Sequence, residues 1–236
     1  MTTVRSNRAS SDGSRSISTT VRISAGDAHL EGTLTIPGNA RGLVLFAHGS
    51  GSSRLSPRNQ YVAELLNEAG LATLLFDLLT PQEEIIDLRT THLRFNIPLL
   101  AERMVKATQW VGGQEQVNGL SVGYYGASTG AAAALVAAAE MPGTVAAVVS
   151  RGGRPDLAGP ALGRVRAATL LIVGGADLPV LEVNHRALQQ MRCIRELAIV
   201  PGATHLFEEP GALEQVASLA SRWFQQYLAG VAQSAA

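Results

Sequence analysis

The segment GASTG at 126–130 combines a hydroxyl that could act as a nucleophile with the small neighbours that such a residue needs. It follows a short apolar run at 121–125 and precedes an alanine-rich segment with helical character. Strand, G-x-S-x-G turn and helix in this order are typical of a nucleophile elbow, where the serine has a strained backbone and strand and helix pass closely. The pattern predicts that Ser128 is a nucleophile, although a tight turn with a helix-capping serine would have the same spacing.

A nucleophilic serine needs a base to take its proton and an acid to orient that base. Asp177 closely follows the apolar run at 169–173, and His205 lies in the loop after the run at 196–200. The three residues therefore follow the order Ser, Asp, His, each just beyond a predicted strand, and we expect Ser128, Asp177 and His205 to form a catalytic triad. Asp156 is an alternative acid, while Asp177 could instead cap a helix and His205 could simply be solvated.

The glycine-rich loop after the run at 42–47 is the expected second half of the catalytic machinery. The sequence there is HGSGSSR at 48–54, and glycines allow a main-chain N–H group to point at a developing oxyanion. We expect the backbone amides of Ser50 and Thr129 to be the two donors, with Gly49 or Gly51 as alternatives to Ser50 by one step of register. His48 then has the role of shaping the loop.

Three arginines near these segments, Arg54, Arg89 and Arg151, could bind a carboxylate or phosphate of a substrate. Alternatively, each pairs with a nearby acid or stays solvated; the acids considered are Asp156, Asp87 and Glu83. The stretch 78–98 is long for a crossover loop, and we expect it to shape the acyl or leaving-group pocket; the alternative is a loop followed by an early amphipathic helical turn without substrate contact.

The rest of the chain indicates how these residues are held. Runs 20–24 and 29–36 predict an antiparallel hairpin, and six nearly continuous apolar runs predict strands covered on both faces; they lie at 42–47, 72–76, 121–125, 145–149, 169–173 and 196–200. Segments with helical spacing alternate with them. This order predicts an α/β fold with an eight-stranded, mostly parallel, doubly wound sheet, and the 16 residues between Ser150 and Ala167 are too few for a cap domain.

Composition and charge exclude several function classes. Nineteen basic and nineteen acidic residues give no excess charge for nucleic acid or a membrane surface. No apolar run reaches the roughly 18 residues of a membrane span. The single Cys193 permits no internal disulfide and favours a reducing compartment, for which we expect the cytoplasm. We expect a disordered tail at 1–19, which also has transit-peptide composition, and one domain at 20–236.

Together the motifs resemble the α/β-hydrolase superfamily, and within it the small, capless dienelactone hydrolase-like group. The resemblance rests on 48–54, 126–130, VGGAD at 173–177 and PGATH at 201–205. Dienelactone hydrolase itself carries a cysteine nucleophile, where this chain has Ser128. The resemblance implies serine-type hydrolysis of an ester, lactone or thioester of a small molecule, without metal or organic cofactor. An acyltransferase or cofactor-free perhydrolase with the same triad, and a non-catalytic ligand-binding module on the same fold, remain alternatives. No feature selects the oligomeric state.

Overall fold

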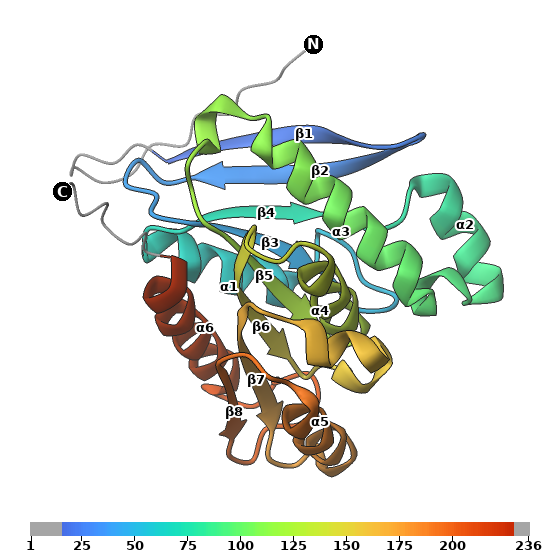
Figure 1. Cartoon of the computed structure of the whole chain (residues 1–236), viewed down its shortest axis with the longest axis vertical. Coiled ribbons are helices and arrows are strands. Elements are labelled where there is room, and N and C mark those ends of the chain that lie inside the picture. The colour runs from blue at the N-terminus through green and yellow to red at the C-terminus, as the bar shows by residue number, and fades with distance from the viewer. Residues whose placement is uncertain (1–15, 229–236) are drawn as a thin grey trace.

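The computed structural model describes residues 16–228, which form an eight-stranded sheet between two layers of helices (Figure 1). The spatial order of the strands is β1-β2-β4-β3-β5-β6-β7-β8. Strands β3 to β8 run parallel, and β1 and β2 are antiparallel. Their bounds are β1 (Ile17–Ala25), β2 (Ala28–Ile36), β3 (Leu43–Ala47), β4 (Ala72–Phe76), β5 (Val122–Ala127), β6 (Val145–Arg151), β7 (Ala168–Gly174) and β8 (Arg195–Val200). The predicted mostly parallel sheet with an N-terminal antiparallel hairpin is confirmed.

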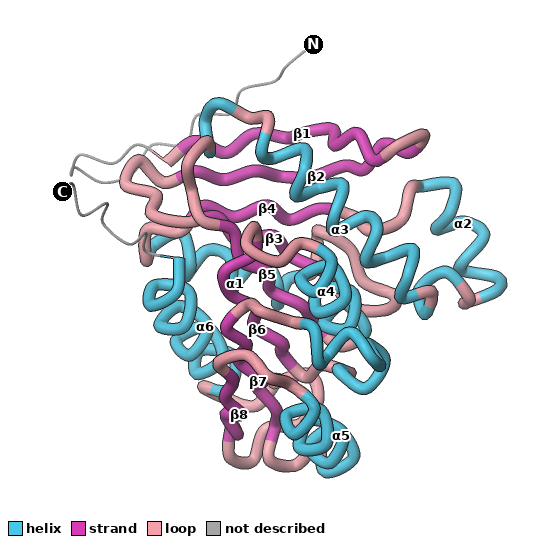
Figure 2. The backbone as a smooth tube through the Cα atoms, in the orientation of Figure 1, coloured by secondary structure: helices cyan, strands magenta, loops and turns pink. Residues whose placement is uncertain are grey.

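The helices cover both faces of the sheet, which explains why its central strands are buried along their whole length and mostly apolar (Figure 2). One face packs against α1 (Pro57–Glu68) and α6 (Ala212–Leu228), and the other against α3 (Ile97–Gly112), α4 (Thr129–Glu140) and α5 (Leu178–Gln190). Two separate apolar clusters result, one in each layer. Because parallel strands end at one edge of the sheet, the loops after β3, β5, β6, β7 and β8 meet there, where the predicted site residues lie.

The first strand begins earlier than predicted. We expected a tail at 1–19, but β1 starts at Ile17, which pairs with Ile36. Residues 17–19 are exposed and mostly polar, so main-chain pairing holds them rather than apolar burial, and composition does not reveal that pairing. Ser18 and Thr35 also share a hydrogen bond of 3.0 Å between their hydroxyls. The rest of the predicted tail, at 1–15, lies outside the described residues, as does 229–236 of the predicted domain.

Two connections of the sheet bear on the site. The stretch after β4 folds into a helix, α2 (Pro81–Thr90), and a 3-10 turn, η1 (Leu93–Phe95), before α3 begins. In Figure 1, α2 lies at the periphery of the molecule, away from the sheet. Between β6 and β7 the described chain holds the 3-10 segment η3 (Pro155–Arg164), so that connection carries no cap domain.

Candidate active site

Ser128 occupies the sharp turn between β5 and α4, as the elbow pattern predicts. Its backbone has φ 51° and ψ −120°, a conformation that costs a non-glycine residue energy and that persists only when its surroundings enforce it. Two hydrogen bonds supply that enforcement. The Ser128 amide donates to the Arg151 carbonyl at 3.2 Å, and the Arg154 amide donates to the Ser128 carbonyl at 3.1 Å. The end of β6 therefore fixes the orientation of the serine.

Glycine is required on both sides of the elbow. A Cβ atom on Gly126 would lie 2.4 Å from the Ala131 Cα, and one on Gly130 would lie 2.3 Å from the Ala47 carbonyl oxygen. Both obstacles are backbone atoms, which cannot turn aside as a flexible side chain can. The two glycines of G-x-S-x-G are therefore needed because α4 passes very close to β5 and to the end of β3.

The predicted acid and base lie at neighbouring strand ends and form a hydrogen bond. Asp177 follows β7, His205 follows β8, and His205 Nδ1 lies 2.7 Å from Asp177 Oδ2. Because an ionised carboxylate only accepts, Nδ1 carries the proton, and the other ring nitrogen, Nε2, is left able to accept one. Glu209 secures the histidine loop, since it accepts from the Thr204 amide at 3.0 Å and hydroxyl at 2.6 Å, and the Thr204 hydroxyl lowers the pKa of the Glu209 carboxyl.

The glycine-rich loop after β3 lies directly against the elbow. A Cβ on Gly49 would be 3.1 Å from the Ser128 Cβ. Thr129 is the first residue of α4, so its amide is one of those that a helix leaves without an internal partner. The Ser50 amide likewise donates no hydrogen bond within residues 16–228. Both expected oxyanion donors are therefore available to a ligand.

His48 holds this loop, as expected. Its Nε2 accepts from the Leu78 amide at 3.0 Å, and its Nδ1 lies 3.0 Å from the Gly49 carbonyl oxygen, so the neutral ring with a proton on Nδ1 satisfies both contacts. Burial lowers the pKa of His48 and keeps the ring neutral. The ring thus joins the loop after β3 to the segment after β4.

Two cavities flank the loop at 49–52. The first, about 210 Å³, holds Ser128, Arg151 and His205 and is called the histidine cavity; its lining is completed by Gly49, Ser50, Ser52, Ser56, Arg58, Asn59, Ala127 and Leu206. The second, about 180 Å³, is called the leucine cavity after Leu78, Leu79, Leu88 and Leu100, and it includes Thr129; its lining is completed by His48, Gly49, Ser50, Gly51, Ser52, Ser53, Asp77, Glu84, Asp87 and Arg94. Gly49, Ser50 and Ser52 line both, so the loop forms a shared wall.

Of the three predicted arginines, the structure brings only Arg151 to the histidine cavity. Arg54 instead binds Asp77, through its guanidinium and its backbone amide, and Glu31 at 2.7 Å. Arg89 is exposed on α2. Asp156, the alternative acid, pairs with Arg154 at 2.7 Å rather than with His205.

Arg151 is 5% exposed, and within residues 16–228 it forms no ion pair with a carboxylate. Its guanidinium carbon lies 5.6 Å from the centre of the Phe207 ring, and its Nε lacks a hydrogen-bond partner there. Burying a charge without a counter-charge is costly, so this side chain is a candidate for ligand binding.

Sequence reasoning missed several lining residues. Asn59, buried at 2% exposure, lines the histidine cavity, yet it lies in α1, for which only apolar spacing was noted. Sequence reasoning allowed only a short helical turn in the stretch 78–98 and missed the full length of α2, because just one of its residues, Asp87, is buried. Its signal was the pair Thr80 and Glu83, which form a capping box beside Pro81.

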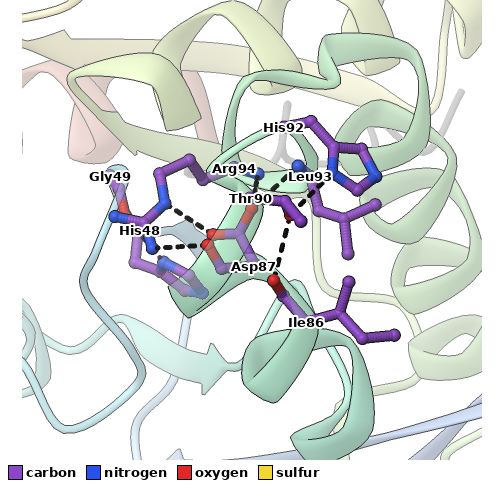
Figure 3. Close-up of polar contacts among 8 residues, drawn as sticks. All are labelled: His48, Gly49, Ile86, Asp87, Thr90, His92, Leu93 and Arg94. Atoms are coloured by element: carbon purple, nitrogen blue, oxygen red, sulfur yellow. Dashed lines mark hydrogen bonds and ion pairs between the residues drawn. The ribbon is translucent and has the colours of Figure 1, made fainter.

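Asp87 and Arg94 anchor the 3-10 turn beside the leucine cavity. Figure 3 shows the two side chains pointing toward each other next to His48. Arg94 Nε lies 2.5 Å from Asp87 Oδ2. Burial would raise the pKa of Asp87, but the hydrogen bonds from Arg94 and Leu93 outweigh it and lower that pKa. The excursion after β4 therefore forms a helix and also lines a cavity beside the loop at 49–52.

Within residues 16–228, no group of three or more His, Cys, Asp or Glu side chains could hold a metal ion. None of the helices there combines the length and hydropathy needed to cross a membrane.

Comparison with solved structures decides the family. A dienelactone hydrolase from Anabaena variabilis is 63% identical, with a TM-score of 0.89, and the match covers 90% of this chain and 99% of that one. The chain belongs to the dienelactone hydrolase family. More distant members of the fold include the dienelactone hydrolase-like promiscuous phosphotriesterase P91 from metagenomic libraries, 17% identical with a TM-score of 0.73 over 90% of this chain and 98% of that one. At that identity the likeness extends to the fold alone.

One relative of this dienelactone hydrolase-like chain is a much longer protein. A Mycobacterium tuberculosis protein provisionally named a phosphoribosyl transferase is 59% identical over 210 residues, which are 89% of this chain and 46% of that protein. The chain therefore spans about half the length of the curated relative that it matches. No family model matches the chain.

Proposed function

We propose that the protein is a serine hydrolase that cleaves an ester, lactone or thioester of a small molecule through an acyl-enzyme intermediate. The observation that carries the proposal is the 2.7 Å contact between His205 and Asp177, beside a cavity that Ser128 and His205 line together. Membership of the dienelactone hydrolase family supports hydrolysis.

In the proposed reaction, His205 Nε2 takes the proton of Ser128 as the serine oxygen attacks the carbonyl carbon. Asp177 stabilises the imidazolium, and the amides of Ser50 and Thr129 bind the oxyanion. The tetrahedral intermediate then collapses as His205 protonates the leaving group. Water, activated by the same histidine, attacks the acyl-enzyme and releases the acid and free Ser128. The strained backbone of Ser128 supports this role, because a sharp strand-to-helix turn is the conformation that exposes a nucleophilic serine in this fold.

We assign to Arg151 a contact with a polar or anionic group of the substrate. Its buried guanidinium has an aromatic neighbour but no carboxylate within the described residues. Arg54 and Arg89 have no such position, since one is engaged by Asp77 and Glu31 and the other lies exposed on α2. The single cysteine fits action in a reducing compartment, and we propose the cytoplasm.

Hydrolysis of a panel of p-nitrophenyl esters, lactones and thioesters tests the proposal with Ser128→Ala. The variant should lose at least about 10⁴-fold in kcat on every substrate that the parent turns over, with an unchanged circular dichroism spectrum. Ser218→Ala, which removes an exposed hydroxyl on α6, serves as the matched control and should retain full activity. Turnover by Ser128→Ala within tenfold of the parent would contradict the proposal.

A further inference from the structure

We propose that the two cavities divide the substrate, with the acyl group in the leucine cavity and the leaving group in the histidine cavity. This inference rests on the proposed function, because it assigns positions to the two halves of a substrate cleaved at Ser128. Three observations carry it: which catalytic groups line each cavity, which side chains complete each lining, and the volume of each.

The first observation concerns the proton donor. The leaving group must receive its proton from His205, and His205 lines the histidine cavity but not the leucine cavity. The departing oxygen, nitrogen or sulfur atom therefore lies on the histidine side of the loop at 49–52. Thr129, whose amide is a proposed oxyanion donor, lines the leucine cavity, and Ser50 lines both. Ser128, which bonds to the acyl carbon, lines the histidine cavity, so the acyl group begins there and its substituent extends past Ser50 and Thr129 toward the leucine cavity, opposite the leaving group.

The second observation is the contrast in chemistry between the linings. The leucine cavity has an apolar floor, where Leu78 and Leu100 are almost fully buried. Its charged lining residues Asp77, Asp87 and Arg94 already have charged partners, since Asp77 binds Arg54 and Asp87 binds Arg94, and Leu88 and Glu84 lie at its exposed rim. The histidine cavity instead contains Arg151 and Asn59, and neither Arg151 Nε nor Asn59 Oδ1 has a hydrogen-bond partner within the described residues. Buried polar atoms without partners favour a ligand that supplies them. The expected substrate accordingly has an apolar acyl group and a polar leaving group.

The third observation is size. A cavity of about 150 Å³ lined by apolar side chains accommodates benzene. The leucine cavity, at 180 Å³, therefore suits one six-membered ring or a chain of about six carbons. The Thr129 hydroxyl, buried at 4% exposure and without a partner in the described chain, offers one hydrogen bond to a polar atom of that group. Longer acyl groups would have to leave past Leu88, which is 71% exposed.

Two substrate series test the division. In the first, p-nitrophenol is the constant leaving group while the acyl chain grows from acetyl to octanoyl; kcat/KM should rise about fourfold per methylene and level off near six carbons. In the second, the acyl group is constant and the alcohol is varied between apolar and hydroxyl- or carboxyl-bearing forms of equal length. Polar alcohols should be preferred in the second series, by about tenfold.

Variants in each cavity test which of the two binds the acyl group and which binds the alcohol. Leu88→Trp at the rim should move the acyl optimum to shorter chains, and Leu79→Ala, which enlarges the same cavity, should move it to longer ones. Both should leave the order of the alcohols unchanged. Leu206→Trp, at the partly exposed rim of the histidine cavity, should alter the alcohol series and leave the acyl optimum in place. Opposite shifts from Leu88→Trp and Leu79→Ala give a result that simple loss of folding cannot produce.

The proposal is overturned if the acyl optimum responds to Leu206→Trp and not to the two leucine-cavity variants, or if none of the three moves it. Labelling of Ser128 by a fluorophosphonate, followed by intact mass in every variant, separates this failure from a deeper one. If Ser128 is labelled but the acyl optimum responds as just described, only the proposed division of the substrate is contradicted. Parent protein that is folded and is not labelled contradicts the proposed function as well.

Discussion

His205 Nδ1 and Asp177 Oδ2 lie 2.7 Å apart, although 28 residues of chain separate them. The contact exists because β7 and β8 are parallel neighbours, so the loops that leave their carboxyl ends emerge side by side. The Asp177 side chain is only 12% exposed, which shields its carboxylate from competing water, whereas the His205 side chain is 39% exposed. The proposed base therefore has a fixed orientation and a fixed tautomer before any substrate binds.

Asp177→Asn tests the importance of that tautomer. An amide at this position can leave the wrong histidine nitrogen protonated, so we expect kcat on a p-nitrophenyl ester to fall by about 10³- to 10⁴-fold. Asp156→Asn is the matched control, because Asp156 pairs with Arg154 in a partly exposed position and should change kcat less than twofold. A larger loss from Asp156→Asn than from Asp177→Asn would transfer the role of the acid to Asp156.

Gly130→Ala should destabilise the fold by about 2–3 kcal/mol, because its new Cβ would meet the Ala47 carbonyl oxygen, which packing holds in place. In a chain of this size the thermal midpoint should fall by about 5–10 °C. Gly112→Ala, in the last turn of α3, has no atom within 4 Å of the added Cβ and should leave the midpoint unchanged or slightly higher. Thermal unfolding followed by circular dichroism measures both, and equal midpoints would refute the close crossing at the elbow.

Stability should decline as the pH falls below about 6.5, in part because of His48. Burial lowers the pKa of His48 below its ordinary value of 6.5, so in this range the unfolded chain binds more protons than the native protein. The stabilisation is present above pH 6.5 and is lost on acidification toward the native pKa. The lowered pKa of Asp87 acts in a separate window, because its stabilisation is lost below the ordinary carboxyl value of 3.8.

Urea unfolding between pH 7.5 and 5 isolates the histidine contribution. His48→Gln should flatten the dependence by up to about 1.4 kcal/mol per pH unit, the limit for one proton. His185→Gln, on the exposed side of α5, should keep the slope of the parent protein. If His48→Gln and the parent have the same slope, the buried neutral ring is not what couples stability to pH.

Arg151→Met tests the proposed contact with a charged or polar group. Methionine preserves much of the packing on Phe207 but removes the guanidinium, so kcat/KM should fall by about 10- to 100-fold for esters that carry a carboxylate and little for neutral esters. Arg89→Met, on exposed α2, should affect neither class. Equal turnover of the charged esters by Arg151→Met and the parent would remove Arg151 from substrate recognition.

The sequence alone predicts the sheet well, because the signals of its strands are local. Continuous apolar runs identify the strands, and the parallel order brings Ser128, Asp177 and His205 to one edge of the sheet. Gly126 and Gly130 also predict the local structure, because each lies where a side chain would clash with nearby backbone atoms.

Features that depend on distant partners are not predictable in the same way. Arg54 and Arg151 look equivalent in the sequence, and only the placement of Asp77 and Glu31 beside one of them distinguishes their roles. Exposed β1 residues 17–19 are held by pairing with β2, which composition does not encode. Helix α2 depends on its capping box rather than on a buried face, so hydrophobic spacing misses it.

Covalent labelling of the parent protein by a fluorophosphonate, located by peptide mapping, tests the central claim most directly, because it requires an activated serine but no knowledge of the substrate. We predict a single adduct on Ser128 that is absent in Ser128→Ala and strongly reduced in His205→Ala. Folded protein that acquires no adduct, or one that is labelled equally without His205, would contradict the proposed nucleophile and its activation.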